Sequence, residues 1–330
     1  MNGPTAPLDA VVVGGGPAGL SAATWLARYR RSVVVLDSGE YRNRWVARSH
    51  GYLGADPQDP MRLLERARED LARYDRVAVR RARATDVRRD GDGRFVVTAD
   101  GTELVALRLV LATGVVDQFP EVDGFLEHYG TSVFHCPTCD GYEARERSVV
   151  VLGWSEHVAG FALGLLDWAA RVTVVTEERP FEGEERHRDA LARHDVALLE
   201  DDAVAFEGER GDLRAVLLRS GIRLPADLVF FSIAHHPRVD LAAQLGCELT
   251  PEGCLVVDDE GRTSVEGVYA AGDVTPGLQL AAVAAGTGTV AGVACAASLR
   301  GEPGASSSPD PAPDPEAAVG GTGEAGTSKG

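Results

Sequence analysis

The chain has 330 residues, which exceeds the ~250–300 residues at which a single core stops growing and therefore predicts two domains. Apolar residues make up 44% and charged residues 25% of the chain, an ordinary composition for a soluble protein. The net charge of −17 argues against proteins that track nucleic-acid phosphates or bind anionic membranes, because the mean field repels polyanions. No apolar run reaches the ~18 residues of a membrane span, and no signal peptide is evident. We therefore expect neither nucleic acid nor a membrane as a partner.

Five cysteines are present, and an odd number without an export signal argues against a disulfide-stapled secreted scaffold. A thiol-reducing compartment is favoured instead, so we expect a cytoplasmic location. Cys247, Cys254 and Cys295 lie beside apolar residues and are predicted to be buried structural thiols. The close pair Cys136 and Cys139 indicates redox or metal chemistry.

Short β-branched runs alternate with helical stretches along most of the chain, which is typical of βαβ units and parallel sheets. The predicted strands are Ala10–Val13, Val33–Asp37, Leu109–Ala112, Val149–Leu152, Val172–Thr176, Leu228–Ile233 and Gly267–Ala270. The strand–turn–helix units at residues 10–37 and 148–177 look alike, so we expect an α/β fold with two Rossmann-like nucleotide domains. Residues 301–330 contain Gly, Pro, Ser, Ala and acidic residues but no aromatic residue, which predicts a disordered acidic tail.

A glycine-rich turn follows the first strand and opens a helix from about residue 20 to residue 29. It comprises Gly14, Gly15, Gly16, Pro17, Ala18 and Gly19. In such a turn Gly14 allows the tight bend, Gly16 lets a pyrophosphate approach the backbone, and Gly19 lets the helix pack on the strand. The next strand ends at Asp37, whose carboxylate can accept hydrogen bonds from a ribose. The strand, turn, helix, strand and terminal acid together predict a bound dinucleotide.

Two later segments indicate which dinucleotide is bound. Residues 111–114 read L-A-T-G after an apolar strand, and residues 267–274 read G-V-Y-A-A-G-D-V before an Ala/Gly-rich helix over 279–299. Both segments resemble those of flavoproteins with two dinucleotide folds. The resemblance implies FAD in the first site, with Gly272 at the helix start and Asp273 on the ribityl chain. The other FAD contacts that it implies are Asn43, Thr113, Gly114 and Gln279.

Residues 134–142 read F-H-C-P-T-C-D-G-Y and resemble the C-x-x-C-D-G active site of low-molecular-weight thioredoxin reductases. Two thiols at this spacing can close a disulfide, and C-x-x-C sites lower a thiol pKa. Asp140 adjoins the second thiol and could shuttle a proton to or from it. Structural zinc needs four ligands, but only His135 is near and no second C-x-x-C exists, so we predict no metal site. By resemblance, Cys139 is the flavin-proximal sulfur and Cys136 exchanges with substrate.

The same resemblance implies the domain organisation and the assembly. The FAD domain is expected to comprise residues 1–117 and 237–300, and the inserted domain with the dithiol to comprise residues 118–236. The H-H-P sequence at 235–237 resembles the family's hinge-like return to the FAD domain. A homodimer is implied by family resemblance alone.

The second nucleotide turn departs from the family pattern. The family carries G-G-G-x-[ST]-A for NADPH, whereas residues 153–158 read G-W-S-E-H-V. Ser155 replaces the glycine of closest approach, Glu156 adds a carboxylate near the expected pyrophosphate, and Val158 replaces the small residue that seats the helix. After the next strand the family carries H-R-R-x-x-x-R around the 2′-phosphate. Here Thr176 takes the place of the histidine, and Glu177, Glu178 and Glu182 take the places of the arginines.

These replacements make NADPH doubtful as a cofactor. A like-charge pair at ~4 Å costs on the order of 1–4 kcal/mol at a partly exposed site, and several such pairs could exceed the ~4 kcal/mol between micromolar and millimolar binding. NADH stays possible, because Glu177 could accept a hydrogen bond from an unphosphorylated ribose. Drift of the turn without a change of function is the alternative interpretation.

One branch of this family resembles the chain most closely: the dithiol oxidases that close disulfides in small natural products. They keep FAD and C-x-x-C, lack a working NADPH motif and pass electrons to oxygen. Arg42 and Asn43, followed by S-H-G-Y-L-G at 49–54, look like that branch. Those oxidases typically have histidine after the second cysteine, where this chain has Asp140. His50 and His135 are further candidate bases, although each could equally be a packed or surface histidine.

The sequence therefore predicts an FAD-dependent dithiol/disulfide oxidoreductase in which electrons move between a substrate dithiol, the cysteine pair and the flavin. The leading variant is a dithiol oxidase that uses oxygen or another acceptor. The alternatives are an NAD(P)H-dependent thioredoxin reductase and, from another class, a non-catalytic flavin-bound redox sensor. The expected partner is a small-molecule dithiol or disulfide, or a thioredoxin-like protein.

Overall fold

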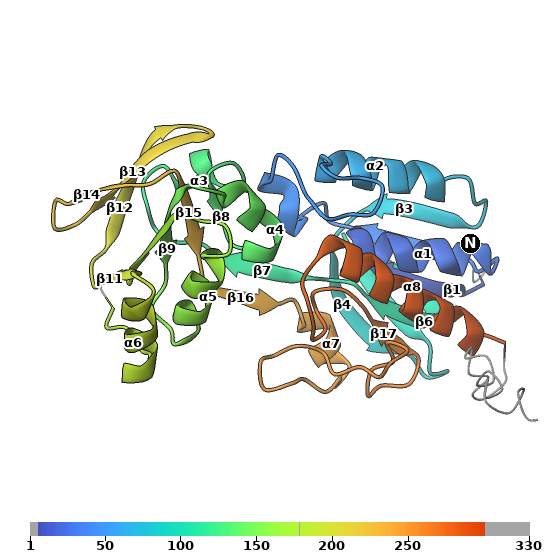
Figure 1. The fold of residues 1–330 in the computed structure, drawn as a ribbon. Helices are drawn as coiled ribbons and strands as arrows, with labels where there is room; N and C mark the ends of the chain where they lie inside the picture. Colours follow the sequence, from blue (N-terminus) through green and yellow to red (C-terminus); the bar gives the residue numbers. More distant parts are fainter. Residues whose placement is uncertain (1–5, 178, 301–330) are drawn as a thin grey trace, which may run out of the picture.

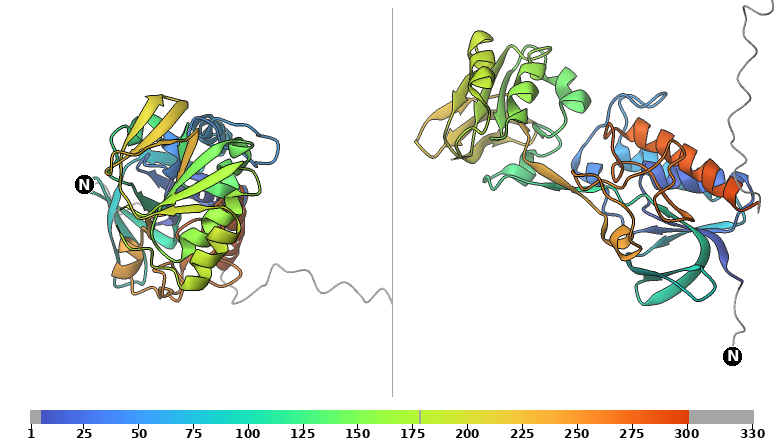
Figure 2. Two further views of the ribbon diagram at one scale, coloured as in Figure 1. Left: turned by 60° about the vertical axis from the view of Figure 1, so that its left-hand side comes forward. Right: turned by 90° about the horizontal axis from the view of Figure 1, so that it is seen from below.

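The computed structural model describes residues 6–177 and 179–300. The predicted acidic tail and Glu178 lie outside these described residues. The described chain forms two lobes that are joined by a narrow connection (Figures 1 and 2). Each lobe is built around its own sheet, as the two similar strand–turn–helix units predicted; the sheet of the second lobe is parallel, and that of the first is parallel except for β4 and β5.

The first lobe contains a seven-stranded sheet in the order β3-β2-β1-β6-β5-β4, with β17 pairing to β6. Its strands are β1 (Leu8–Val13), β2 (Val33–Asp37), β3 (Val77–Arg81), β4 (Ala84–Arg89), β5 (Phe95–Ala99), β6 (Thr102–Leu111) and β17 (Val268–Ala270). Its helices are α1 (Pro17–Arg28), η1 (Arg42–Trp45), α2 (Pro60–Leu71), α7 (Asp240–Gln244) and α8 (Ala281–Ser298). Strands β1 and β2 are almost wholly apolar and buried, because α1, α2 and α8 cover one face while β4, β5 and α7 pack on the other.

The second lobe is inserted between β6 and β17 of the first. Its main sheet is parallel, with strand order β11-β10-β9-β15-β8, and carries a separate antiparallel sheet of β12-β13-β14. The strands are β8 (Val133–Phe134), β9 (Ser148–Leu152), β10 (Arg171–Val175), β11 (Ala197–Leu199), β12 (Ala203–Glu209), β13 (Asp212–Leu218), β14 (Arg223–Pro225) and β15 (Leu228–Phe231). The helices are α3 (Phe125–His128), α4 (Pro137–Asp140), η2 (Gly141–Ala144), α5 (His157–Leu165) and α6 (Glu185–Arg193). Helices α5 and α6 cover one face, and β12, β13 and α3 cover the other.

Two antiparallel strands form the connection between the lobes. β7 (Val115–Gln118) leaves the first lobe directly after the A-T-G turn, and β16 (Ala234–Pro237) returns to it. Figure 1 shows both strands crossing the space between the sheets. The H-H-P sequence therefore lies in the return strand, where the resemblance had placed a hinge.

Helix α8 is the one helix of the described residues that is long and apolar enough to cross a membrane by length and composition. It lies along α1 in both figures. A Cβ atom on Gly288 would stand 2.1 Å from the carbonyl oxygen of Ala18, and one on Gly292 would stand 2.6 Å from that of Ala22. Close packing on α1 thus accounts for the small, apolar composition of α8.

Candidate active site

The glycine-rich turn joins β1 to α1 at the carboxyl ends of the parallel strands. Gly14 has a φ of +119°, and a Cβ there would stand 2.1 Å from the carbonyl oxygen of Ala112. A Cβ on Gly19 would stand 1.8 Å from the Gly14 carbonyl oxygen, so both positions require glycine for packing. A Cβ on Gly16 would meet nothing within 4 Å, because this residue faces an open cavity.

That cavity, here called the large cavity, has a volume of about 910 Å³, at the upper end of the ~300–1,000 Å³ of cofactor pockets. Every cofactor residue that the sequence singled out lines it except Gly19. These lining residues are Gly14, Gly16, Pro17, Ala18, Asp37, Asn43, Thr113, Gly114, Gly272, Asp273 and Gln279. The cavity opens onto the N-terminus of α1, whose free N–H groups favour an anion. Its size and this anion site fit an FAD molecule with its pyrophosphate at the glycine turn.

Asp37 lies at the end of β2 and is 3% exposed. Its carboxylate accepts hydrogen bonds from the Gly39 backbone N–H at 2.8 Å, from the Tyr41 hydroxyl at 2.6 Å and from Arg68 at 3.1 Å. These donors fix the carboxylate in the cavity wall where a ribose acceptor was expected.

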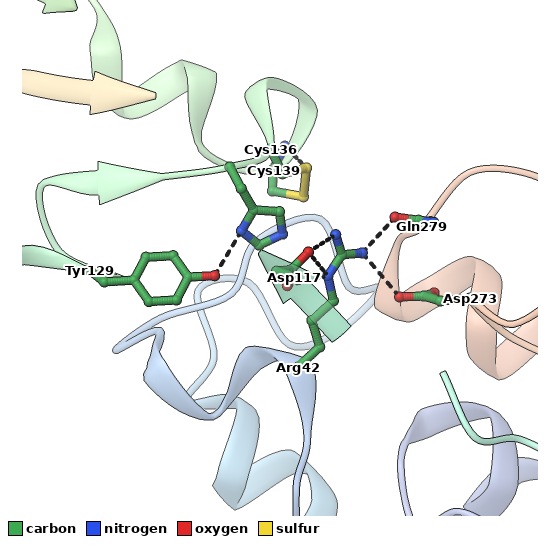
Figure 3. The surroundings of a disulfide bond; sticks show 8 residues. Arg42, Asp117, Tyr129, Cys136, Cys139, Asp273 and Gln279 are labelled. Atoms are coloured by element: carbon green, nitrogen blue, oxygen red, sulfur yellow. Dashed lines mark hydrogen bonds and ion pairs between the residues drawn. A yellow bond between two sulfur atoms is a disulfide. The ribbon is translucent and has the colours of Figure 1, made fainter. Parts of the chain in front are cut away.

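Arg42 connects several segments around the large cavity (Figure 3). Its guanidinium donates to Asp117 of β7 at 2.6 Å, to the side chain of Gln279 at 2.6 Å and to Asp273 at 3.3 Å. Burial raises the pKa of Asp273, and the charge of Arg42 partly offsets that effect. Gln279 in turn hydrogen-bonds His235 of β16 at 2.9 Å. Both connecting strands are therefore fastened to the cavity of the first lobe.

Cys136 and Cys139 form a disulfide at the start of α4, as their spacing predicted. The backbone N–H of Cys139 donates to the Cys136 sulfur at 3.1 Å. Cys139 lines the large cavity, whereas Cys136 lines a neighbouring cavity of about 290 Å³, here called the small cavity. The disulfide thus presents one cysteine to each cavity.

The small cavity lies where the two lobes meet. Phe161 and Phe231 of the second lobe and Leu278 and Leu280 of the first provide apolar walls. Its polar lining includes Arg42, Asp117, His135, His235 and Gln279. A compact molecule with apolar and polar parts can therefore reach Cys136 without entering the large cavity.

Asp140 lies directly after Cys139, is 7% exposed and lines the large cavity. Burial, followed by the charge of Glu143, raises the pKa of Asp140 to about 7, and His50 acts in the opposite direction. A carboxyl group with this pKa can take up and release a proton near neutral pH. The local charge and burial therefore favour the predicted role for Asp140.

The two histidines considered as bases differ in their surroundings. Burial lowers the pKa of His135 to about 4, and its Nδ1 lies 3.0 Å from the Tyr129 hydroxyl. His135 is therefore neutral near pH 7 and is a weak proton acceptor there. His50 is partly exposed and lies between Asp56, at 3.0 Å, and Glu143, at 3.5 Å.

The second glycine turn, at residues 153–156 after β9, is covered by its own neighbours. The Arg179 guanidinium lies 4.0 Å from the centre of the Trp154 ring, and the Glu182 N–H donates to the Trp154 carbonyl at 2.9 Å. A Cβ on Gly153 would stand 2.6 Å from a methyl group of Val158. The retained glycine thus has a packing reason that involves no nucleotide.

Charges near this turn differ in part from the sequence expectation. Glu156 and Glu182 are exposed, as an acidic surface requires. Glu177 is partly buried, and burial raises its pKa to about 7. One of its oxygens has no hydrogen-bond partner among the described residues. Arg179, the cation that stacks on Trp154, was not predicted from the sequence, because it lies at a position where the family pattern carries no arginine.

The three remaining cysteines do not take part in the site. Cys247, Cys254 and Cys295 are buried and free, which confirms the prediction of structural thiols. Within residues 6–177 and 179–300, no group of three or more His, Cys, Asp or Glu residues could hold a metal ion. The sequence did not single out Asp117, Tyr129 or Trp154; only their nearness to the A-T-G turn, the C-x-x-C motif and the second turn could have drawn attention to them.

The chain matches the family described as pyridine nucleotide-disulphide oxidoreductase over residues 8–288. The thioredoxin reductase tcpT of Claviceps purpurea is 32% identical over 302 residues, which cover 86% of this chain and 92% of that protein. A putative thioredoxin reductase TrxB of Bacillus anthracis shows 29% identity and a TM-score of 0.84, over 89% of this chain and 99% of that one. The structure of HlmI shows 35% identity and a TM-score of 0.85, and the match covers 91% of this chain and 95% of that one. The matches extend over both lobes and the connection between them.

Proposed function

Because this chain belongs to the pyridine nucleotide-disulphide oxidoreductase family and resembles low-molecular-weight thioredoxin reductases, we propose that it is an FAD-dependent dithiol oxidase. The coarser statement, that it is an FAD disulfide oxidoreductase acting on sulfur groups, follows from the family. The finer proposal is that a small-molecule dithiol supplies the electrons and that oxygen or another acceptor receives them.

One observation carries this proposal: the disulfide lies between two cavities. Cys136 lines the small cavity and Cys139 lines the large one. A substrate thiolate in the small cavity would attack Cys136, releasing the Cys139 sulfur beside the flavin. The small cavity, of about 290 Å³, suits a compact dithiol with an apolar part that can lie against Phe161 and Phe231.

The substrate dithiol would exchange with the protein disulfide, and the bonds broken and formed balance. Two S–H bonds of the substrate break, its own S–S bond forms, and the protein disulfide becomes two thiols. Closing the protein disulfide again releases two electrons and two protons, and FAD in the large cavity would supply the two-electron acceptor. Asp140 is placed to take the proton of Cys139, because it follows that residue and lines the same cavity.

The second turn supports an enzyme that uses no nicotinamide. The Trp154–Arg179 stack and the Glu182 hydrogen bond cover the turn where a nucleotide would bind. Glu156 lies at the N-cap of α5, where its carboxylate already complements the helix dipole. A pyrophosphate there would have to displace the stack and lie beside this charge.

The second candidate is an NAD(P)H-dependent thioredoxin reductase. The similarity to the thioredoxin reductase tcpT and to the putative thioredoxin reductase of Bacillus anthracis favours it. For that activity, a nicotinamide dinucleotide would have to bind at the second turn. With NADH, Glu177 would accept a hydrogen bond from the ribose. The burial of Glu177 weighs against this role.

We also propose that residues 1–117 with 237–300 form the FAD domain and that residues 118–236 form the inserted domain. Supporting this, β7 and β16 begin and end within a few residues of both limits. The proposed setting is a cytoplasmic homodimer.

Aerobic turnover tests the proposal. The FAD-loaded protein is mixed with dithiothreitol in air, and oxygen uptake and peroxide are recorded without nicotinamide. Oxygen uptake that is lost in Cys136→Ser and retained in Cys247→Ser, a matched cysteine control, would support the proposal. Turnover that starts only when NADPH and a thioredoxin-like disulfide are added would establish the second candidate instead.

A further inference from the structure

We propose that Glu143 and His50 carry the proton between Asp140 and solvent, so that these two positioning residues complete the thiol–flavin reaction. This inference rests on the proposed function. It assigns a role to two side chains that do not contact the disulfide and that no motif connects to each other.

The need for an exit follows from the proton balance. When the Cys136–Cys139 disulfide closes again, two S–H bonds break, one S–S bond forms, and two electrons and two protons leave the sulfurs. Both electrons and one of the protons would pass to FAD bound in the large cavity, so the second proton would have to leave that cavity. Asp140 can receive it, but Asp140 is only 7% exposed and gives a poor direct path to water.

The positions of the side chains provide such a path. Asp140 ends α4, and the short helical turn η2 that follows directly carries Glu143, whose charge acts on the Asp140 carboxyl. One oxygen of Glu143 lies 3.5 Å from Nε2 of His50. The other oxygen is buried and has no hydrogen-bond partner among the described residues, so it is available to accept a proton.

His50 completes the path to the surface. It comes from the 46–59 loop of the first lobe, and it lines the large cavity together with Asp140. Its Nδ1 lies 3.0 Å from Asp56, whose side chain is 52% exposed. The imidazole can accept a proton on one nitrogen and release the other proton toward Asp56 and water.

Electrostatics at Asp140 agree with this geometry. The ionisable groups that act on it are Glu143 from η2 and His50 from the 46–59 loop, which respectively raise and lower its pKa. Burial raises the pKa of Tyr129, and the charge of Asp140 acts on it in the same direction, so the Tyr129 hydroxyl stays neutral. Burial with these charges leaves the pKa of Asp140 at about 7, so the carboxyl can both accept the thiol proton and pass it on.

The experiment uses FAD-loaded protein under argon, mixed rapidly with dithiothreitol while flavin bleaching is recorded across the pH range. The variants are His50→Ala and Glu143→Gln. The matched controls are His157→Ala and Glu121→Gln, which change exposed side chains of the same kinds. We expect both variants to slow bleaching by about tenfold, less than the ~10²–10⁴-fold of direct acid–base catalysis, while the controls match wild type.

Two readouts separate proton transfer from a purely structural role. Added imidazole should restore the rate of His50→Ala, because it can replace the missing ring, but should not restore Glu143→Gln. The pH profile of iodoacetamide alkylation of the reduced thiols should be the same in His50→Ala and wild type, because a transfer path alters rates and not the equilibrium thiolate fraction.

The outcomes that overturn the inference are distinct. Wild-type bleaching rates in both variants would show that the proton leaves another way. Slow bleaching without imidazole recovery, together with a changed alkylation profile, would show that His50 only fastens its loop. If no dithiol bleaches the wild-type flavin, the proposed function itself fails and the inference fails with it.

Discussion

Replacing Asp140 by asparagine should make the protein more stable at alkaline pH and less active. In the folded protein, burial raises the pKa of this carboxyl from 3.8 to about 7. Between these two values the folded state holds a proton that the unfolded state has lost, so wild-type stability falls as the pH rises. Asparagine is neutral and nearly isosteric, and it does not titrate.

The magnitude follows from the shift. A shift from 3.8 to about 7 is about three pKa units. Across the full pH range, this shift lowers the free energy of unfolding of the wild type by about 4 kcal/mol. Part of this loss in the free energy of unfolding is already present at about pH 5. The difference in the free energy of unfolding between Asp140→Asn and wild type should therefore grow by about 3 kcal/mol between about pH 5 and pH 8.

Urea unfolding of the oxidised, FAD-loaded proteins at a series of pH values measures this difference. Asp75→Asn, a change at an exposed position, is the matched control and should run parallel to wild type. The reasoning would be refuted if the Asp140→Asn and wild-type stability curves were also parallel. Dithiol bleaching of the flavin should at the same time be slowed, because the proton acceptor beside Cys139 is gone.

Three further results are expected. Cys139→Ser should leave Cys136 open to alkylation by a bulky maleimide from the small cavity and abolish dithiol bleaching of the flavin; rapid bleaching in this variant would assign the flavin-proximal role elsewhere. Asp273→Ala should lower the FAD retained through gel filtration, whereas the exposed control Asp259→Ala should not; equal retention would remove Asp273 from the site. Glu177→Gln should raise the urea midpoint at about pH 8 but not at about pH 5, because burial raises the pKa of Glu177 and its ionised form opposes folding; pH-independent midpoints would contradict this account.

Local patterns in the sequence were sufficient for seven strands, among them β1, β2, β9 and β10 of the two similar units. The strands that were not predicted are β3, β4, β5, β7, β8, β11, β12, β13, β14 and β16. The glycine turn after β1 was predictable because the requirements at Gly14 and Gly19 are steric and act within one strand–turn–helix unit. The cysteine pair was predictable because a disulfide between residues three apart needs no long-range information. The predicted strands were recovered within one or two residues at most ends, except that β6 begins seven residues earlier, at Thr102, where its pairing with β5 extends it.

Contacts between distant segments were not predictable in this way. Arg42 joins Asp117, 75 residues away, to Asp273, 231 residues away, and no local pattern links these positions. The stack of Arg179 on Trp154 depends on two loops meeting above β9 and β10. The low pKa of His135 arises from burial between the lobes, which a residue type cannot indicate.

The central claim is that electrons enter this flavin from a dithiol through Cys136 and Cys139 and not from a nicotinamide. Anaerobic stopped-flow mixing of the FAD-loaded protein with dithiothreitol, NADPH and NADH in separate experiments tests it most directly. The account predicts rapid bleaching by the dithiol, no saturable bleaching by either nucleotide, and return of the yellow colour when air is admitted. Saturable bleaching at micromolar NADPH would contradict it and establish a nicotinamide-dependent reductase.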